Sequence, residues 1–201
     1  QAAQFPSSIF ADVAGRRGAL HGRIRALRPD MKFAGTALTV EVRPGDNLMI
    51  HAAMSLAKPG DVLVVDGKGD QTSALMGTIM FTACKQLGLA GVVVDGAVRD
   101  SGTLAAWPDF PVFARGRTPR GPSSMERGAV NVPVVVGGVR VEPGDLVLGD
   151  DDGLVIVPRA EAAGRLAAAQ AMVRAEEGWE AQLARGETTL AVFAVPPAEP
   201  G

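Results

Sequence analysis

The residue pair best suited to chemistry is Arg99–Asp100, which follows an apolar run and an Asp–Gly turn. Parallel α/β layers bind ligands beyond the carboxyl ends of their strands, so we expect both side chains at such an edge. A guanidinium there can hold a 2-oxo acid in a bidentate fork, and the neighbouring carboxylate can hold Mg²⁺. On residue types alone, a local surface salt bridge between the two is an open alternative.

Two other segments have the composition of ligand loops without the required spacing. The glycine-rich loop Asp66–Asp70 follows an apolar run, but Thr72 stands where a dinucleotide fingerprint needs a third glycine, and no Walker ending occurs. The acidic run at 150–153 lacks the spacing of an EF-hand. We therefore expect no nucleotide site in the first segment and a charged turn between two strands in the second. The triplet Pro-Gly-Asp at 44, 59 and 143 fits no repeat and indicates turns.

The two histidines and the single cysteine are interpreted as structural residues. His21 and His51 lie far apart in the sequence, and neither has a partner at the spacing of a metal site. His51 falls on a predicted helix face, where we expect a histidine with satisfied hydrogen bonds. Cys84 lies among apolar residues of a predicted helix and is expected in the core.

The elements that position Arg99 and Asp100 are predicted from hydrophobic periodicity. Apolar runs at 62–65 and 92–94 predict buried strands, and helical spacing predicts a helix over about 72–87 between them. A strand, a helix and a strand in this order predict a right-handed βαβ unit. The other predicted elements are a helix over about 6–15, a strand at 38–42, a helix from about 47, short strands at 112–114, 132–136, 139–141, 146–148 and 154–157, and a helix at about 159–185.

Length and composition limit the architecture. The 201 residues fit one domain, and the 47% hydrophobic fraction excludes a disordered chain. Because only 4% of the residues are aromatic, the core must be built from aliphatic residues and methionine. We expect an α/β fold in a single compact domain over 1–201, with a βαβ layer, a strand-rich second half and a long C-terminal helix. Its core is expected at about 35–158.

Composition also bears on location and partners. No apolar run approaches the ~20 residues that span a membrane, and the first residues do not form a signal peptide pattern. The net charge of −2 argues against a dedicated nucleic-acid binder. One cysteine excludes an internal disulfide framework, which favours a cytoplasmic protein.

Charge is distributed unevenly along the chain. Residues 1–34 carry six Arg/Lys and two Asp, whereas residues 141–201 carry eleven acids and four Arg. Either both ends form solvated helices, or the oppositely charged ends meet within a subunit or across a subunit interface.

The segment Gly91–Asp100, with Ala74–Gly77 upstream, resembles the 4-hydroxy-4-methyl-2-oxoglutarate aldolase family, which is related to the regulators of ribonuclease activity A. The resemblance extends from about Gly35 through Pro44–Asn47 to Asp152–Pro158. It implies a lyase dependent on Mg²⁺ or Mn²⁺ that cleaves a C–C bond of a 4-hydroxy-2-oxo acid and releases pyruvate. Oxaloacetate decarboxylation is the implied second activity, and trimers or hexamers with active sites between subunits are the implied assembly.

The resemblance also implies roles for individual residues. Arg99 matches the substrate-binding arginine and Asp100 the metal-binding aspartate. The segment Gly77, Thr78, Ile79 and Met80 matches the helix start whose amides hold the substrate carboxylate. For these amides to be free, the predicted helix must break or restart at Gly77.

Thr78 departs from the family pattern, in which an acid that orders water at the metal commonly follows the glycine. A threonine hydroxyl can hydrogen-bond water but carries no charge. Arg99, Asp100 and Thr78 are nevertheless the catalytic residues that the resemblance implies. In the aldolases an acid from a neighbouring subunit also reaches this water, and Glu176 or Glu177 is in the right region for that role.

The sequence leaves two other functions open and argues against one other mechanism. The chain could be a non-catalytic regulator that binds a ribonuclease, or a family member that acts on a different 2-oxo acid. A Schiff-base mechanism is not expected, because no lysine lies in an apolar strand where its pKa would fall.

Overall fold

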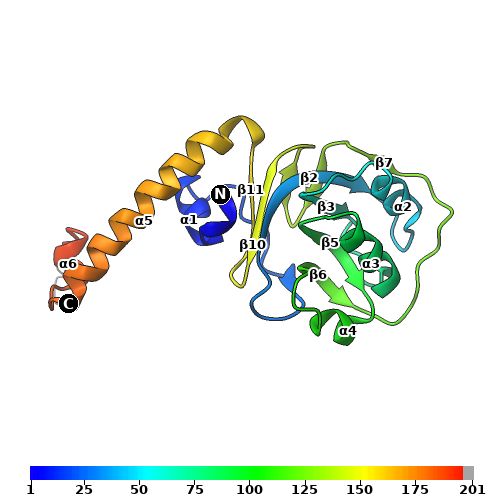
Figure 1. Cartoon of the computed structure of the whole chain (residues 1–201), viewed down its shortest axis with the longest axis horizontal. Helices are drawn as coiled ribbons and strands as arrows, with labels where there is room; N and C mark the ends of the chain where they lie inside the picture. Colours follow the sequence, from blue (N-terminus) through cyan, green and yellow to red (C-terminus); the bar gives the residue numbers. More distant parts are fainter. Residues whose placement is uncertain (197–201) are drawn as a thin grey trace.

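The valine-rich runs predicted as strands form the centre of a curved sheet (Figure 1). β3 (Asp61–Asp66) and β5 (Gly91–Val98) pair in parallel, and β2 (Phe33–Glu41) and β6 (Val112–Arg117) extend the parallel part on either side. Every residue of β5 is buried, as expected for a strand with both faces covered. The computed structural model describes residues 1–196, so the last five residues of the predicted domain lie outside the described part.

Antiparallel strands complete this nine-stranded mixed sheet. Its order is β1-β6-β5-β3-β2-β10-β11, with β4 paired to β5 and β7 to β2, and contact between β1 and β11 largely closes it. A separate hairpin consists of β8 and β9. The bounds of these strands are β1 (Arg25–Ala26), β4 (Ala74–Met76), β7 (Ala129–Val130), β8 (Val134–Val136), β9 (Val139–Val141), β10 (Leu146–Asp150) and β11 (Gly153–Val157). The acidic run at 150–153 forms the predicted turn between β10 and β11.

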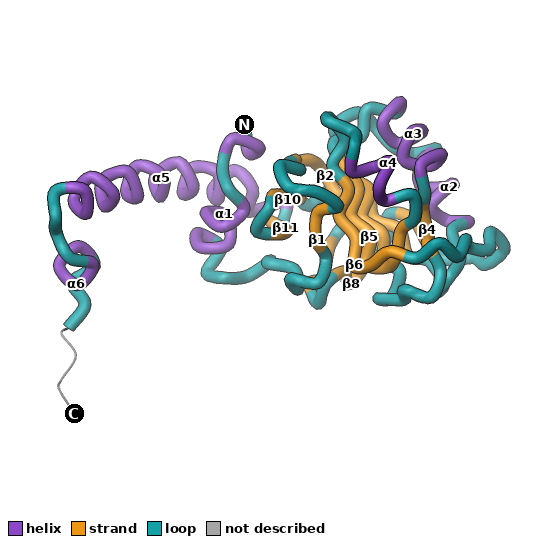
Figure 2. The backbone as a smooth tube through the Cα atoms, turned by 90° about the horizontal axis from the view of Figure 1, so that it is seen from below, coloured by secondary structure: helices purple, strands orange, loops and turns teal. Residues whose placement is uncertain are grey.

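Three helices lie on one side of the sheet (Figure 2): α2 (Leu48–Met54), α3 (Thr78–Gln86) and α4 (Ser101–Ala105). α3 buries Met80, Phe81 and Cys84, which confirms Cys84 as a core residue. The predicted helix over 72–87 is wrong in its first part, because residues 74–76 pair with β5 as a strand. The predicted restart at Gly77 is confirmed, since this glycine immediately precedes α3.

The loop Asp66–Asp70 uses its polar groups internally. The amide and the ammonium group of Lys68 both donate to Asp66, and the amide of Gly69 donates to the carbonyl of Asp95. The pKa of Lys68 is raised, chiefly by the hydrogen bond to the Asp66 carboxylate. These contacts commit the amides of Lys68 and Gly69 and the ammonium group of Lys68 to partners within the protein.

The two ends of the chain meet within one subunit. α1 (Ser7–Val13) packs against the first half of α5 (Ala162–Ala184), around the buried Ala169, and the amide and hydroxyl of Ser7 both donate to Asp150 at 2.6 Å. Among the described residues, no ion pair joins residues 1–34 to residues 141–196. The contact between the two ends of the chain therefore rests on packing and hydrogen bonds.

The remaining short helices flank these elements. They are η1 (Ala2–Gln4), η2 (Arg159–Glu161) directly before α5, and α6 (Thr189–Val192) after it. The second half of α5 and α6 project away from the sheet (Figure 1). Over residues 1–196, no helix combines the length and the apolar character needed to cross a membrane.

Candidate active site

Gly77 joins the end of β4 to the start of α3, and its missing side chain lets two functional groups approach. Parallel pairing of β4 with β5 places the amide of Arg99 2.9 Å from the carbonyl oxygen of Met76. A Cβ atom at Gly77 would lie 2.6 Å from Oδ2 of Asp100 and 2.9 Å from Nε of Arg99. The structure therefore brings Arg99 and Asp100 directly over this glycine.

Asp100 lies at a sharp reversal of the chain before α4. Its backbone is left-handed, with φ 59° and ψ 29°, a conformation that aspartate adopts more readily than most residues. Its Oδ2 accepts a hydrogen bond of 2.9 Å from the amide of Thr78, the first residue of α3. Within residues 1–196, Oδ1 receives no hydrogen bond and is thus open to a cation or to water.

The first turn of α3 presents further donors. The amide of Phe81 donates to the carbonyl of Gly77 at 3.1 Å, which closes the first helical turn. The amides of Ile79 and Met80 have no partner among the described residues, as is usual for a helix N-terminus. Such amides, together with the helix dipole, favour an anion.

A cavity of about 290 Å³ lies over this junction. Gly77, Ile79, Met80, Arg99 and Asp100 of the predicted site line it, together with Asn47, His51, Pro122 and Ser124, which the sequence analysis did not assign to a site. Arg99 and Asp100 also border a larger, open hollow of about 640 Å³ on the side of α4. Arg99 and Asp100 therefore border both a small cavity and an open surface depression.

Three residues that were predicted to belong to the site do not line the cavity. The side chain of Thr78 does not line the cavity, although its amide contacts Asp100. Glu176 and Glu177 lie on α5, which contacts α1, α6 and η2 and not the elements of the site. A single chain does not bring either glutamate to Arg99, so their predicted role requires a neighbouring subunit.

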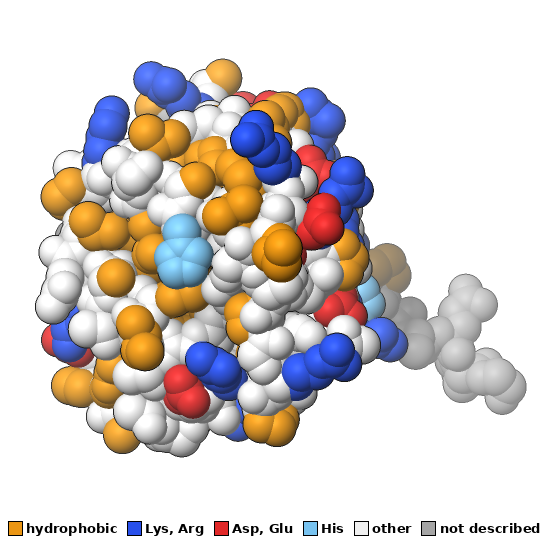
Figure 3. Space-filling view, turned by 90° about the vertical axis from the view of Figure 1, so that its right-hand side faces the viewer, with side chains coloured by type: hydrophobic (Ala, Val, Ile, Leu, Met, Phe, Trp, Pro, Cys, Tyr) orange, Lys and Arg blue, Asp and Glu red, His pale blue; other side chains and the backbone are white. Residues whose placement is uncertain are grey.

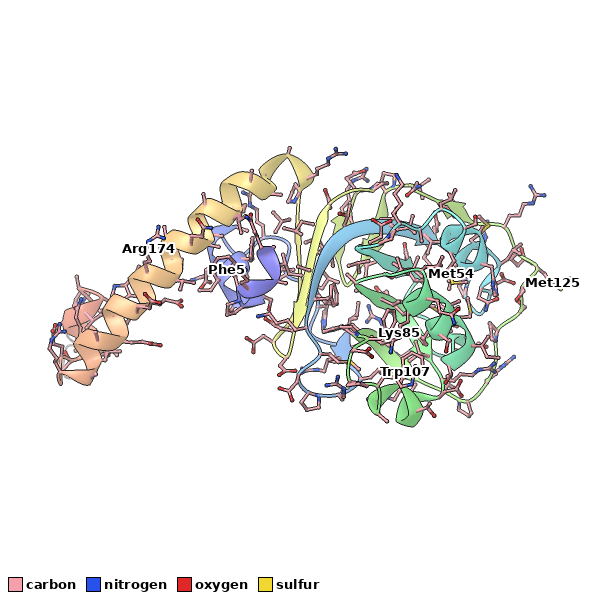
Figure 4. All side chains as sticks on the ribbon, in the orientation of Figure 1. Phe5, Met54, Lys85, Trp107, Met125 and Arg174 are labelled. Carbon is pink, nitrogen blue, oxygen red and sulfur yellow. The ribbon has the colours of Figure 1, made fainter. Side chains whose placement is uncertain are left out.

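Asp46 and Asn47 hold the loop over 122–126 against the cavity. Oδ2 of Asp46 accepts hydrogen bonds from the hydroxyl of Ser123 at 2.6 Å and from the amide of Met125 at 2.8 Å. Asn47 accepts from the hydroxyl of Ser124 and donates to the carbonyl of Leu75 at 3.1 Å. Met125 itself is 83% exposed and points outward from this loop (Figure 4).

The ionisation of Asp46 reflects these bonds. Burial raises the pKa of its carboxyl, but hydrogen bonds from the Met125 amide, the Ser123 hydroxyl and two further amides outweigh burial and lower the pKa to about 2. The sequence pattern Pro44–Gly45–Asp46 predicts a turn alone. The turn is present, and its aspartate also fixes a loop that comes from a distant part of the chain.

His51 is not the hydrogen-bonded structural histidine that the sequence pattern predicts. Its side chain is exposed, lines the cavity, and makes no hydrogen bond within residues 1–196. The interpretation was wrong because the predicted helix face turns toward the cavity and not toward the core, which receives Ile50 and Ala53 instead.

The donor set limits the kind of metal that could bind. No group of three or more His, Cys, Asp or Glu side chains that could hold a metal occurs in the described part of the chain. Among the described residues, Asp100 is the one carboxylate that lines the cavity, and one of its oxygens receives no hydrogen bond there. Mg²⁺ typically keeps several waters and takes one or two carboxylates plus the substrate, and Mn²⁺ also suits oxygen ligands. The residues present fit such an ion and do not fit a site made of protein ligands alone.

Comparisons with known proteins place the chain among relatives of the same fold. A model of the RraA-like family, described as Aldolase/RraA, matches residues 7–156. A protein of Halalkalibacterium halodurans, provisionally named 4-hydroxy-4-methyl-2-oxoglutarate aldolase, is 41% identical over 156 residues, which are 78% of this chain and 74% of the relative.

Solved structures show the same likeness. An uncharacterised protein of Pseudomonas syringae pv. tomato superposes with a TM-score of 0.81 at 26% identity, covering 94% of this chain and 92% of that one. RraAS2 of Streptomyces coelicolor, described as an unusual member of the RNase ES inhibitor RraA protein family, superposes with a TM-score of 0.75 at 31% identity, covering 91% and 92%.

Proposed function

The chain belongs to the RraA-like aldolase family, and from this premise we propose that it is a divalent-metal-dependent lyase. It cleaves a C–C bond of a 4-hydroxy-2-oxo acid of the 4-hydroxy-4-methyl-2-oxoglutarate type and releases pyruvate. One observation carries the proposal: a guanidinium, a carboxylate and free helix amides converge on Gly77 at one cavity.

Each group has a distinct part in this reaction. The amides of Ile79 and Met80 hold the carboxylate of the 2-oxo acid, because they are unpaired and lie at the positive end of α3. Arg99 binds the 2-oxo oxygen and stabilises the negative charge that develops there as the C–C bond breaks. Asp100 would hold the cation, and Mg²⁺ or Mn²⁺ bound there would supply Lewis-acid polarisation of the 2-oxo group.

The substrate's hydroxyl must also lose a proton during cleavage. Thr78 carries no charge and its side chain lies outside the cavity, so it does not act as a base. A water molecule takes this proton, and we assign the ordering of that water to Glu176 or Glu177 of the partner subunit. The assembly is then a cytoplasmic trimer or hexamer. Oxaloacetate decarboxylation is the second activity, since loss of CO₂ from oxaloacetate gives the same enolate of pyruvate.

The test is a pyruvate-coupled assay with 4-hydroxy-4-methyl-2-oxoglutarate and with oxaloacetate, with and without Mg²⁺. We expect pyruvate release that depends on the metal and is abolished in Asp100→Asn, with the thermal midpoint nearly unchanged. Asparagine is the informative replacement because it tolerates the left-handed backbone and still accepts the Thr78 amide. Asp152→Asn, at an exposed position in the turn between β10 and β11, is the matched control and should keep full activity.

Two other outcomes would replace this proposal. Pyruvate release from other 2-oxo acids alone would indicate a family member with a different substrate. Absence of release from every 2-oxo acid tested, together with binding and inhibition of a ribonuclease, would indicate a regulator, the activity by which the Streptomyces coelicolor relative is described.

A further inference from the structure

The cavity contains one ionisable side chain that the proposed reaction does not use, His51. It is exposed and lines the same cavity as Gly77, Arg99 and Asp100. Leu75, Met76 and Pro122 line the cavity with it, and many apolar side chains are exposed on the end of the molecule that carries α2 and α3 (Figure 3). An imidazole with a free N–H group in such surroundings is available to a ligand.

The position of His51 is fixed by the residue one helical turn before it. Asn47 and His51 are four residues apart at the start of α2, so they lie on the same helix face. Asn47 is tied to Leu75 and Ser124 by its side chain, and the amide of Leu48 donates to Asp46 at 2.9 Å. Ile50 and Ala53 bury the opposite face of α2 in the core. His51 is therefore presented to the cavity by a helix that is held at both faces.

The other donors of the cavity are already used. Asn47 donates its amide to Leu75, and Ser124 donates its hydroxyl to Asn47. Arg99 and the amides of Ile79 and Met80 are assigned to the 2-oxo acid end of the substrate. The remaining lining is largely apolar, with Leu75, Met76 and Pro122 among it. Within residues 1–196, His51 is the one lining side chain whose donor is neither hydrogen-bonded in the protein nor assigned to the 2-oxo acid end of the substrate.

Resting on the proposed function, we propose that His51 determines specificity by donating a hydrogen bond to a second carboxylate, at the far end of the substrate. The dicarboxylic substrate of the proposed function is then bound by Arg99 and the α3 amides at one end and by His51 at the other. The cavity of about 290 Å³ is at the lower end of small-molecule pockets, which suits a substrate of this size.

Turnover measurements test the proposal with a matched pair of substrates. 4-Hydroxy-4-methyl-2-oxoglutarate and 4-hydroxy-4-methyl-2-oxopentanoate differ only in whether the far end is a carboxylate or a methyl group. For His51→Leu we expect kcat/KM on the dicarboxylate to fall roughly 10- to 100-fold, mainly through KM, because a hydrogen bond to a charged group is lost. On the monocarboxylate the change should be less than about twofold. His51→Gln keeps an N–H donor and should restore part of the difference.

The control is His21→Leu, which removes the only other histidine, an exposed residue outside the cavity. It should behave as the unaltered protein does on both substrates. An equal fall on both substrates in His51→Leu would show a structural or general catalytic role and overturn the proposal. Unchanged kinetics on both would overturn it as well.

Binding separates this inference from the proposed function. Calorimetric titration with 2-oxoglutarate and 2-oxopentanoate, in the presence of Mg²⁺, requires no cleavage. We expect the unaltered protein to prefer 2-oxoglutarate and His51→Leu to lose that preference, even if no substrate releases pyruvate. Equal affinity of the unaltered protein for the two acids, or a preference that survives in His51→Leu, would refute the role of His51 whatever the reaction is.

Discussion

Gly77 is the residue on which the geometry of the site most depends, because only hydrogen atoms fit between the start of α3 and the side chains of Arg99 and Asp100. We predict that Gly77→Ala lowers pyruvate release at least tenfold. A methyl group would lie 2.6 Å from Oδ2 of Asp100 and would displace the carboxylate from the Thr78 amide. Assays at saturating Mg²⁺, with the thermal midpoint measured in parallel, check this prediction.

A second glycine provides the control for that substitution. Gly164 lies in α5, outside the cavity and the hollow beside it, and a Cβ atom there would meet nothing within 4 Å. Gly164→Ala should leave activity unchanged and, because alanine favours a helix, should not lower the thermal midpoint. Full activity in Gly77→Ala would show that the close approach of Arg99 and Asp100 is not required for the reaction.

Thr78 offers a test of how charge is distributed around the metal. With threonine at this position, Asp100 is the one carboxylate that lines the cavity among the described residues. We predict that Thr78→Asp lowers the Mg²⁺ concentration for half-maximal activity and raises turnover, because it adds a negative charge at the residue whose amide contacts Asp100, close enough to attract the cation from outside the cavity. Titration of activity against Mg²⁺ for both proteins is the measurement. Identical half-saturation and turnover would mean that position 78 only begins the helix.

The residues of the site differ in how far the sequence could predict them. Arg99 and Asp100 were found because they follow a buried strand, and the local motif around them carries the family resemblance. Asn47 and His51 were missed as cavity residues because they reach the cavity through the packing of α2, which depends on contacts with distant strands. The polarity of a helix face does not show whether solvent, core or cavity lies beside it.

At the scale of elements, strand β4 shows how tertiary pairing overrides local preference. Ala74, Leu75 and Met76 are among the best helix formers, and the apolar spacing continues into α3, so the sequence predicts one helix. They form a strand instead because Ala74 and Met76 pair with Ala97 and Val98 of β5. This pairing ends at Gly77 and leaves the α3 amides free, so the error in the predicted helix falls at the candidate site.

The loop over 122–126 depends on the ionised form of Asp46, which gives it a pH dependence. The folded pKa of about 2 lies below the ordinary value of 3.8, so the charged carboxylate stabilises the fold above about pH 4, and this contribution is lost as the pH falls through 2. The shift corresponds to on the order of 2 kcal/mol. We predict that Asp46→Asn lowers the free energy of unfolding at pH 7 and flattens its pH dependence between pH 4 and 2.

Denaturant unfolding at several pH values measures this effect. Asp12→Asn is the control, because Asp12 is exposed and its side chain makes no hydrogen bond within residues 1–196. Its pH dependence should follow that of the unaltered protein. A pH dependence in Asp46→Asn as steep as in the unaltered protein would show that other carboxylates determine acid stability.

At the scale of the whole molecule, the two halves of the long helix α5 differ in how they pack. The first half of α5 lies on α1, but the second half and α6 extend away from the sheet (Figure 1). The rings of Trp179 and Phe193 stack edge to face, 5.2 Å apart, at the far end. Leu183, Leu190, Phe193 and Val195 there are 37–48% exposed. The second half of α5 and the described residues after it form an arm, and its far end carries these exposed apolar side chains. Such an exposed apolar patch is typical of a surface that packs on another subunit.

The assembly of the protein connects this arm to the candidate site. We expect a trimer or a hexamer in solution, because such an assembly would cover the apolar end of the arm and could bring Glu176 or Glu177 of the partner subunit to the cavity. Light scattering at micromolar concentration measures the state, and Leu190→Asp with Phe193→Asp should shift it toward smaller species with a parallel loss of pyruvate release. Arg174→Asp, a charged position earlier on α5, is the control for altered charge alone (Figure 4). A monomer with full activity would contradict both the shared site and the role of the glutamates, and the water that takes the substrate's proton would then have to be ordered by groups within one chain.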